Sequence, residues 1–176
     1  MADRTIIETE FIKAYDDYSD AIFRYCYYRV FDRERAKDIV QEAYCRTWKY
    51  VSAGKKIDNM RAFIYRTANN IIIDESRKKK SSSLDQIMEK GFTPSVDIRE
   101  KTENYFFGKE ILQLVKSLEE KYREVIILKY VEDLSTKEIS LILNETENNI
   151  YVRLNRGLQK IKKIVGSQES LSNQES

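Results

Sequence analysis

The stretch that decides the fold is LSTKEISLILNETENNIYVRLNRGLQKIKKIV, residues 134–165. It predicts two helices that are separated by a very short break. Ser135, with Glu138 three residues later, forms a capping box that begins the first helix. Thr146 can cap the second helix, in which apolar residues recur every three to four positions. A short helix, a tight turn and a longer helix predict a helix-turn-helix.

The polar face of the second predicted helix suits DNA recognition. In a helix-turn-helix, the N-terminal half of the second helix lies in the major groove. Asn can pair bidentately with adenine and Arg with guanine, and basic side chains also neutralise phosphate. This face carries Asn148, Asn149, Arg153, Asn155, Arg156 and Lys160. A helical hairpin with a solvated polar face is the alternative interpretation of this stretch alone.

The composition favours an all-α protein with a heavily charged surface. Of the 176 residues, 41% are hydrophobic and 34% are charged, and only 5 are Gly and 1 is Pro. So few breakers favour helices over a β-sandwich or a barrel. The formal net charge is only +2. Positive charge is nevertheless concentrated at 75–80 and 153–163, which favours phosphate contact.

Several kinds of site are excluded by residue content. The chain has no His, which excludes zinc fingers of the usual type and His-based catalysis, and we expect neither a metal nor another cofactor. Cys26 and Cys45 lack CxxC spacing and are expected to be buried thiols in a reducing compartment. No apolar run approaches the roughly 20 residues that span a bilayer. We therefore expect a cytoplasmic protein without membrane insertion.

The hydrophobic pattern divides the chain into two helical domains. We expect the first domain at 1–82, a linker at 83–104, the second domain at 105–166 and a disordered tail at 167–176. Three helices are expected in the first domain, at about 5–30, from 33 to about 51 after a cap by Asp32, and at about 60–79. The only proline, Pro94, lies in the predicted linker.

Two faces of the first domain suggest binding. Asp38 and Glu42 lie four residues apart on a helix, with no basic residue between them on that face. Like charges at this spacing are mildly destabilising, and a basic partner would relieve their repulsion. The alternative interpretation is that these two carboxylates are ordinary solvated surface groups. The outward face of the third helix is expected to combine aromatic and basic groups, which suits nucleic acid, although ordinary packing could also explain its aromatic residues. That face is predicted to carry Arg61, Tyr65, Arg66, Asn69, Ile73 and Arg77.

Three stretches together resemble the sigma-70 family. DIVQEAYCRTWKY (Asp38–Tyr50) and FIYRTANNIIIDESRKKK (Phe63–Lys80) resemble its region 2, and Ser117–Ile161 resembles its region 4. The short linker leaves no room for a region 3 domain, as in the extracytoplasmic-function group. The resemblance implies two small helical domains joined by a flexible linker. It also implies a non-enzymatic factor that binds core RNA polymerase, directs promoter recognition and assists melting of promoter DNA.

The resemblance also assigns residues to partners. The family's DxxQE helix docks on the beta-prime clamp helices of core RNA polymerase, and region 4 binds the beta flap. The corresponding polymerase-binding residues are Asp38, Gln41, Glu42, Cys45 and Arg46. An anti-sigma factor is a further partner that the resemblance allows.

Promoter contacts follow from the same resemblance. The loop at 51–59 matches the place where the family captures a flipped base of the minus-ten element, and unstacking a base costs a few kcal/mol. The minus-ten residues are expected to be Lys55, Lys56, Asn59, Arg61, Arg66, Asn69, Asn70, Arg77 and Lys78. The minus-thirty-five residues are expected to be Thr136, Lys137, Asn148, Asn149, Tyr151, Val152, Arg153, Asn155, Arg156 and Lys160.

The sequence departs from the family pattern at a few positions. Phe63 stands where a Trp is usual, Asn149 where a Thr is common, and Gly157 where an Ala is usual. Gly costs up to about 1 kcal/mol in a helix interior. Two alternatives from other classes are a stand-alone helix-turn-helix regulator and a metal-dependent enzyme such as a DNA recombinase. Against the enzyme, no metal-ligand spacing is evident.

Overall fold

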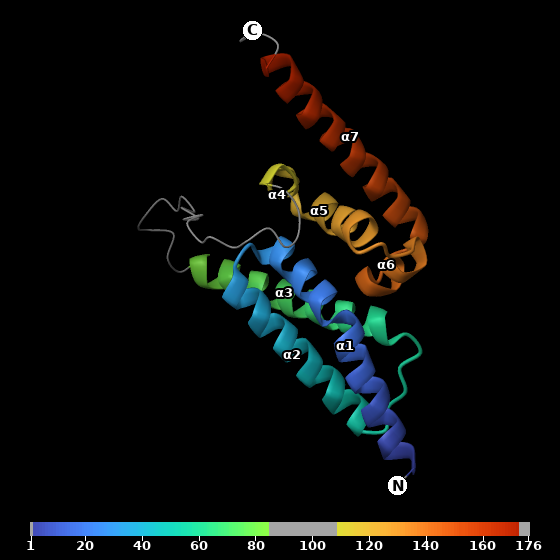
Figure 1. Cartoon of the computed structure of the whole chain (residues 1–176). Coiled ribbons are helices and arrows are strands. Elements are labelled where there is room, and N and C mark those ends of the chain that lie inside the picture. Colours follow the sequence, from blue (N-terminus) through green and yellow to red (C-terminus); the bar gives the residue numbers. More distant parts are fainter. Residues whose placement is uncertain (1, 85–108, 173–176) are drawn as a thin grey trace.

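The computed structural model describes residues 2–84 and 109–172, and every regular element in these ranges is a helix. Figure 1 shows two groups of helices, which we call the N-terminal domain (α1–α3) and the C-terminal domain (α4–α7). The elements are α1 (Ala2–Val30), α2 (Arg33–Ser52), α3 (Met60–Leu84), α4 (Lys109–Ser117), α5 (Glu120–Ile126), the π-helix η1 (Ile127–Val131), α6 (Thr136–Leu143) and α7 (Glu147–Ser172). The predicted all-α, two-domain fold is confirmed.

The N-terminal domain is a three-helix unit in which α1 packs against both α2 and α3. Phe31, with φ 54°, turns the chain between α1 and α2, and the Asp32 side chain accepts a hydrogen bond from the Arg35 amide to cap α2. This cap was predicted. The core is fully buried at Ile22, Tyr25 and Ile64.

One face of α3 differs from the prediction. Tyr65 and Asn69 were expected to point outward, but they are only 0% and 3% exposed. The physical reason is that α3 packs against α1, α2 and α6, so that three neighbours leave it a narrow solvent face. The contact with α6 comes from the other domain, and no local pattern in the sequence of α3 reveals it.

The helix-turn-helix has the predicted caps. The Ser135 hydroxyl accepts a hydrogen bond from the Glu138 amide, and the Glu138 carboxylate accepts one from the Ser135 amide at 2.9 Å. Asn144, in the left-handed conformation with φ 54°, ends α6. The Thr146 hydroxyl then accepts a hydrogen bond from the Asn149 amide at the start of α7. These contacts define the start of α6, the turn after it and the start of α7.

Gly157 has a packing role in α7. A Cβ atom at this position would lie 3.1 Å from Cγ1 of Ile126, which is tighter than ordinary contact. The glycine therefore allows α7 to approach α5 closely. This close approach offsets part of the expected cost of glycine in a helix interior.

Two helices extend past the limits predicted for their segments. Helix α7 continues to Ser172 and includes residues 167–172 of the expected tail. Gln, Glu and Leu in this segment are good helix formers, and it contains no proline. Helix α3 extends to Leu84, two residues into the predicted linker at 83–104. The rest of the linker, the expected second-domain start at 105–108 and the end of the tail at 173–176 lie outside the described residues.

The two cysteines differ from each other. Cys26 is buried as expected, and burial raises the pKa of its thiol to about 12. Cys45 is exposed, because it lies on the solvent side of α2, so the prediction that it is buried was wrong. Among the described residues, no helix is both long enough and apolar enough to cross a membrane.

The two domains lie against each other. Helices α4, α5 and η1 contact α1, and α6 contacts α3. In Figure 1 the C-terminal domain lies across α1 and α3, whereas α2 is on the other side of the N-terminal domain. The contact surface therefore covers one face of the first domain and leaves the α2 face open.

Candidate nucleic-acid and protein interfaces

The N-terminal half of α7 presents an exposed polar face. Tyr151 is 56% exposed and Val152 is 39% exposed, and both lie beside Asn and Arg side chains. Such a face offers amide and guanidinium groups to base edges and an apolar group to a thymine methyl. The exposed members of the predicted minus-thirty-five set are Lys137, Asn148, Asn149, Tyr151, Val152, Asn155 and Arg156.

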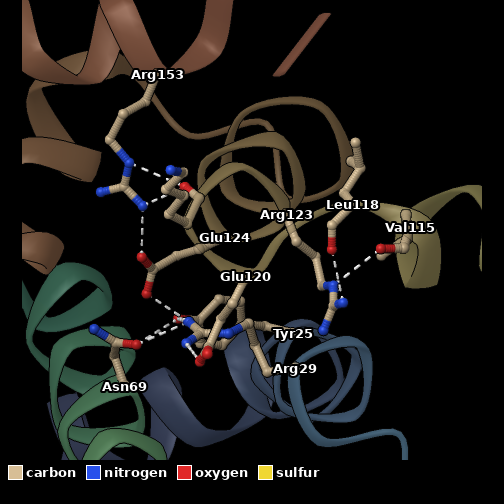
Figure 2. Close-up of polar contacts among 10 residues, drawn as sticks. Tyr25, Arg29, Asn69, Val115, Leu118, Glu120, Arg123, Glu124 and Arg153 are labelled. Carbon is tan, nitrogen blue, oxygen red and sulfur yellow. Dashed lines mark hydrogen bonds and ion pairs between the residues drawn. The ribbon is translucent and has the colours of Figure 1, made fainter. Parts of the chain in front are cut away.

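Arg153, which was also expected on this face, turns inward. Its Nη2 atom donates to Glu124 Oε2 at 2.8 Å, its Nε atom donates to the Lys121 carbonyl at 3.0 Å, and its Nη1 atom pairs with Glu145. Only 16% of its side chain is exposed. Figure 2 shows the guanidinium directed at α5. In this conformation Arg153 fixes α7 against α5 and does not reach out towards a ligand.

Two further members of this set are also held within the C-terminal domain. Lys160 pairs with Glu119, and its Nζ atom lies 5.2 Å from the ring centroid of Tyr122. Thr136 is buried in the first turn of α6. The predicted set thus divides into seven exposed residues, the inward-turned Arg153, the buried Thr136, and Lys160, which is paired at the surface with its side chain 42% exposed.

The α2 face is exposed along its length. All five predicted polymerase-binding residues, Asp38, Gln41, Glu42, Cys45 and Arg46, lie on it. The two acids have basic neighbours on their own helix: Arg46 Nε donates to Glu42 Oε1 at 3.0 Å, and Arg35 Nη1 lies 3.6 Å from Asp38 Oδ2. The basic partners that would relieve the repulsion between the two acids therefore flank them on the same helix. These exposed pairs are weak enough to exchange for an external basic partner.

Six of the nine predicted minus-ten residues are exposed. They are Lys55, Lys56, Arg66, Asn70, Arg77 and Lys78. Lys55 places its Nζ atom 5.0 Å from the centroid of the Tyr50 ring at the end of α2. Basic and aromatic groups side by side suit a nucleic-acid strand. The other three, Asn59, Arg61 and Asn69, are engaged where the two domains meet.

Asn69 belongs to a buried cluster that joins the domains (Figure 2). Its Oδ1 atom accepts hydrogen bonds from Tyr25 Oη at 3.1 Å and from Arg29 Nη1 at 2.8 Å. Arg29 Nη1 also donates to Glu124 Oε1 at 2.5 Å, and Nη2 lies 3.2 Å from Glu120. Glu124 thus bridges Arg29 of the first domain and Arg153 of α7.

The charge of Arg29 is stabilised by this cluster. Burial alone would lower the pKa of its guanidinium, but Tyr25, Glu124 and Glu120 together raise it above its ordinary value. Burial raises the pKa of the Tyr25 hydroxyl strongly, so this group stays neutral and acts as a hydrogen-bond donor and acceptor. Arg29 is therefore a permanent buried cation whose compensating carboxylates come from the other domain.

Glu132 makes a second buried connection. Its side chain accepts hydrogen bonds from Arg24 Nε at 2.8 Å, from Arg24 Nη2 at 2.7 Å and from Tyr65 Oη at 3.1 Å. The Glu132 carbonyl accepts one from Arg61 Nη2 at 2.7 Å. Arg24 and Glu132 are 108 positions apart in the chain, so sequence periodicity could not associate them.

Asn59 lies at the same junction. Its Oδ1 atom accepts a hydrogen bond from the Ala62 amide and so caps α3. Burial alone would raise the pKa of the Glu138 carboxyl, but hydrogen bonds from Ser135, the charge of Arg61 and a hydrogen bond from Asn59 lower it. The start of α3 and the start of α6 thus meet through polar groups. Among the described residues, no cluster of three or more His, Cys, Asp or Glu could hold a metal ion.

Comparison with known proteins supports a single family. The model described as Sigma-70 region 2 matches residues 14–82, and the one described as Sigma-70, region 4 matches residues 108–161. The chain is 30% identical to ECF RNA polymerase sigma factor SigW of Bacillus subtilis (strain 168), with 84% of each chain covered. It is 26% identical to RNA polymerase sigma factor SigV of the same organism, covering 89% of this chain and 90% of SigV.

Solved structures share the fold. The sigma factor RpoE in complex with the anti-sigma factor NepR from Bartonella quintana matches with a TM-score of 0.75 at 18% identity, covering 89% of this chain and 97% of that chain. CnrH in complex with the cytosolic domain of CnrY matches with a TM-score of 0.65 at 16% identity, covering 95% of this chain and 99% of that chain.

Proposed function

The chain belongs to the extracytoplasmic-function group of sigma factors. From this premise we propose which exposed face binds polymerase and which faces bind promoter DNA during transcription initiation. Membership rests on the two family models and on a relative that is 30% identical over most of both chains. Sigma factors of this kind bind core RNA polymerase and promoter DNA. The stand-alone regulator is not favoured, because it requires no region 2 segment.

The exposed acidic face of α2 is proposed to bind polymerase. Asp38, Gln41 and Glu42 are exposed on one helix, and the ion pairs that Asp38 and Glu42 make on that helix are surface pairs. Such pairs contribute little to folding, so they exchange readily for the basic partner that the family's clamp helices offer. Cys45 and Arg46 extend the same face. The C-terminal domain is proposed to contact the beta flap.

The exposed half of α7 is proposed to read the minus-thirty-five element. The observation that carries this proposal is the exposure of Asn148, Asn149, Asn155 and Arg156 in the N-terminal half of α7, which follows the capped turn. A recognition helix uses its N-terminal residues to reach base edges in the major groove. Arg153 and Thr136 are proposed to support this helix from inside the domain, and Lys160 through its surface pair with Glu119.

The minus-ten element is proposed to bind around the 51–59 loop and α3. Lys55, Lys56, Arg66 and Asn70 are exposed there, and Arg77 and Lys78 continue the basic surface. The loop itself is proposed to hold a flipped base, as the family resemblance implies. These roles need positive charge for the backbone and stacking groups for unpaired bases.

The protein is proposed to catalyse no reaction itself. RNA synthesis belongs to the polymerase, and the roles assigned to this chain require binding surfaces alone. It is proposed to act in the cytoplasm, because polymerase and the chromosome are there. Of the two similar structures, one is a complex with an anti-sigma factor and the other is a complex with the cytosolic domain of CnrY. An anti-sigma factor that binds this chain is part of the proposal.

Run-off transcription tests the proposal. Purified protein is added to bacterial core polymerase on a panel of promoter fragments, and transcripts are resolved by length. The expected result is a discrete start site that depends on the protein. Absence of both core association and initiation, together with tight binding to intact duplex DNA, would favour the stand-alone regulator.

A further inference from the structure

The two glycines of α7 have opposite surroundings. Gly157 is buried against α5, and an added Cβ atom would lie 3.1 Å from Cγ1 of Ile126, 3.3 Å from Cδ1 of Ile126 and 3.5 Å from Cβ of Tyr122. At Gly166, an added Cβ atom would meet nothing of its surroundings within 4 Å. The close approach at Gly157 is therefore a property of that position and not of the helix as a whole.

We propose that Gly157 is a positioning residue for promoter recognition. Its missing side chain sets how closely α7 lies against α5, and this spacing sets how far Asn155 and Arg156 reach towards base edges. The inference rests on the proposed function, because it assumes that the exposed half of α7 reads the minus-thirty-five element. Gly157 touches no base itself and acts through the helix that carries the two exposed residues before it.

The α5 side of this contact has little room to yield. Ile126 is 5% exposed and Tyr122 is 7% exposed, and Val125 and Ile127 on either side of Ile126 are fully buried. A close-packed interior accommodates an added methyl group only by shifts of side chains or backbone. The Cβ atom of Tyr122 is fixed by its backbone, so no rotation of that side chain moves this atom away.

Helix α5 is also anchored to the end of α4. Arg123 Nε donates to the Val115 carbonyl at 2.9 Å, and Nη2 donates to the Leu118 carbonyl at 2.8 Å (Figure 2). The part of α7 that follows Gly157 is held less firmly, since Lys162 and Val165 are exposed. A methyl group at position 157 is therefore accommodated by movement of α7 rather than of α5.

The movement reaches Asn155 and Arg156 because α7 is one continuous helix. Its first half is anchored by Ile150, which is 0% exposed. At 1.5 Å per residue, Ile150 and Gly157 are about 10 Å apart along the axis. A helix that tilts about Ile150 moves Arg156 by nearly as much as Gly157, whereas it moves Asn149 little. The added Cβ atom requires a shift of a few tenths of an ångström.

A shift of this size matters for contacts to base edges. An Arg fork on guanine, or an Asn amide on adenine, makes two hydrogen bonds at once, and each needs a distance of about 2.7–3.2 Å and a good angle. Moving the helix changes both bonds together. Contacts to phosphate carry no sequence information and come from side chains that can adjust. We therefore expect an altered base preference and not merely weaker binding.

The test is transcription by core polymerase and the full chain on a pooled promoter library in which the minus-thirty-five segment is randomised. The sequences of the transcribed templates give the base preference at each position. For Gly157→Ala, we expect the preference to change by about threefold or more at the positions read by Asn155 and Arg156. The positions read from the start of α7, and the affinity for core polymerase, should stay unchanged.

Gly166→Ala is the matched control, because it makes the same substitution in the same helix where the added atom meets open space. We expect it to keep the wild-type base preference.

Ile126→Ala, added to Gly157→Ala, removes both atoms that the new methyl group meets most closely. We expect the base preference of this double variant to return to within about twofold of wild type, since the two sites are in contact and their effects are coupled. Thermal unfolding followed by circular dichroism checks that each protein is folded. If the double variant is unfolded, Ile126→Val replaces Ile126→Ala. It removes Cδ1 alone and should restore the preference in part.

Three results would overturn the inference. A folded Gly157→Ala protein with the wild-type base preference would show that the spacing of α7 and α5 does not control recognition. An equal change in Gly166→Ala would assign the effect to alanine in a helix. A preference that stays altered in both double variants would show that the effect does not pass through Ile126. A wild-type protein without any minus-thirty-five preference would instead contradict the proposed function itself.

Discussion

At the scale of single residues, burial decides which basic side chains can bind DNA. Arg153 and Arg156 are three positions apart on α7, yet Arg153 is held by Glu124, Glu145 and the Lys121 carbonyl, whereas Arg156 is exposed. The sequence marks both as basic residues of a recognition helix. It could not show that the partners of Arg153 lie on α5 and in the turn, because these contacts depend on helix packing.

Arg153→Ala should therefore lower the stability of the C-terminal domain. Removing the guanidinium leaves the half-buried Glu145 and the buried Glu124 with fewer donors, which we expect to lower the free energy of unfolding by about 2 kcal/mol. Urea denaturation followed by circular dichroism measures this change. Arg156→Ala is the control, with an expected change close to zero. Equal stabilities of the two variants would contradict the structural role of Arg153.

At the scale of elements, helix caps formed by residues close in sequence were predicted correctly, whereas contacts between helices were not. The caps at Asp32, Ser135 and Thr146 were all predicted, because each depends on residues within three positions along the chain. The prediction for the outward face of α3 was wrong at two residues: Tyr65 bonds to Glu132, which is 67 positions away, and Asn69 bonds to Tyr25 and Arg29 of α1, which are 44 and 40 positions away. The pattern of a helix shows which apolar residues share a face, but it does not show which other helix covers a polar residue.

The π-helix η1 shows a further limit of sequence periodicity. Tyr130 lies in this π-helix and is 56% exposed, whereas Leu128, two residues earlier, is fully buried. The wider turn at Ile127–Val131 changes the angle between successive side chains. It also ends immediately before Glu132, whose buried position depends on this local geometry.

The capping box gives a prediction about α6. Ser135→Ala should lower the free energy of unfolding by about 1 kcal/mol, since the Glu138 amide loses its acceptor and the carboxylate loses a donor. The pKa of Glu138 is lowered in the folded protein, so its contribution is present above its ordinary pKa and is lost as pH falls through the lowered value. The difference between wild type and variant should therefore shrink on acidification.

Urea denaturation at neutral and acidic pH measures this effect. Ser140→Ala serves as the control, because Ser140 lies within the same helix and its hydroxyl donates to the Lys137 carbonyl. A difference for Ser135→Ala that stays constant, or grows, as pH falls would contradict the role assigned to the Glu138 carboxylate.

At the scale of the whole molecule, the domain contact separates two binding faces. The α2 face is open, whereas part of the α3 face is covered by the C-terminal domain. The family resemblance predicted both faces from motifs within each domain. It could not predict the buried ion pairs of Arg24 and Arg29, because the residues that pair with them are 91–108 positions away in the chain.

The open face leads to a prediction about polymerase binding. Asp38→Ala combined with Glu42→Ala should weaken binding to core polymerase about tenfold or more, because two charges facing a basic partner are lost. Folding should be nearly unchanged, since both are surface residues. Asp16→Ala with Asp20→Ala is the matched control, as these acids are exposed at the same spacing on α1. Equal core affinity for the two double variants would contradict the role of the α2 face.

The most direct test of the central claim, that this sigma factor selects promoters through the exposed half of α7, is a transcription assay on a pooled promoter library. Core polymerase is combined with wild type, with Arg156→Ala, or with Lys162→Ala as a control further along α7, and the starting sequences of the transcripts are determined. The account predicts that Arg156→Ala relaxes the base preference at a minus-thirty-five position without changing core binding. Lys162→Ala should keep the base preference of the wild type. An identical base preference in all three proteins would contradict it.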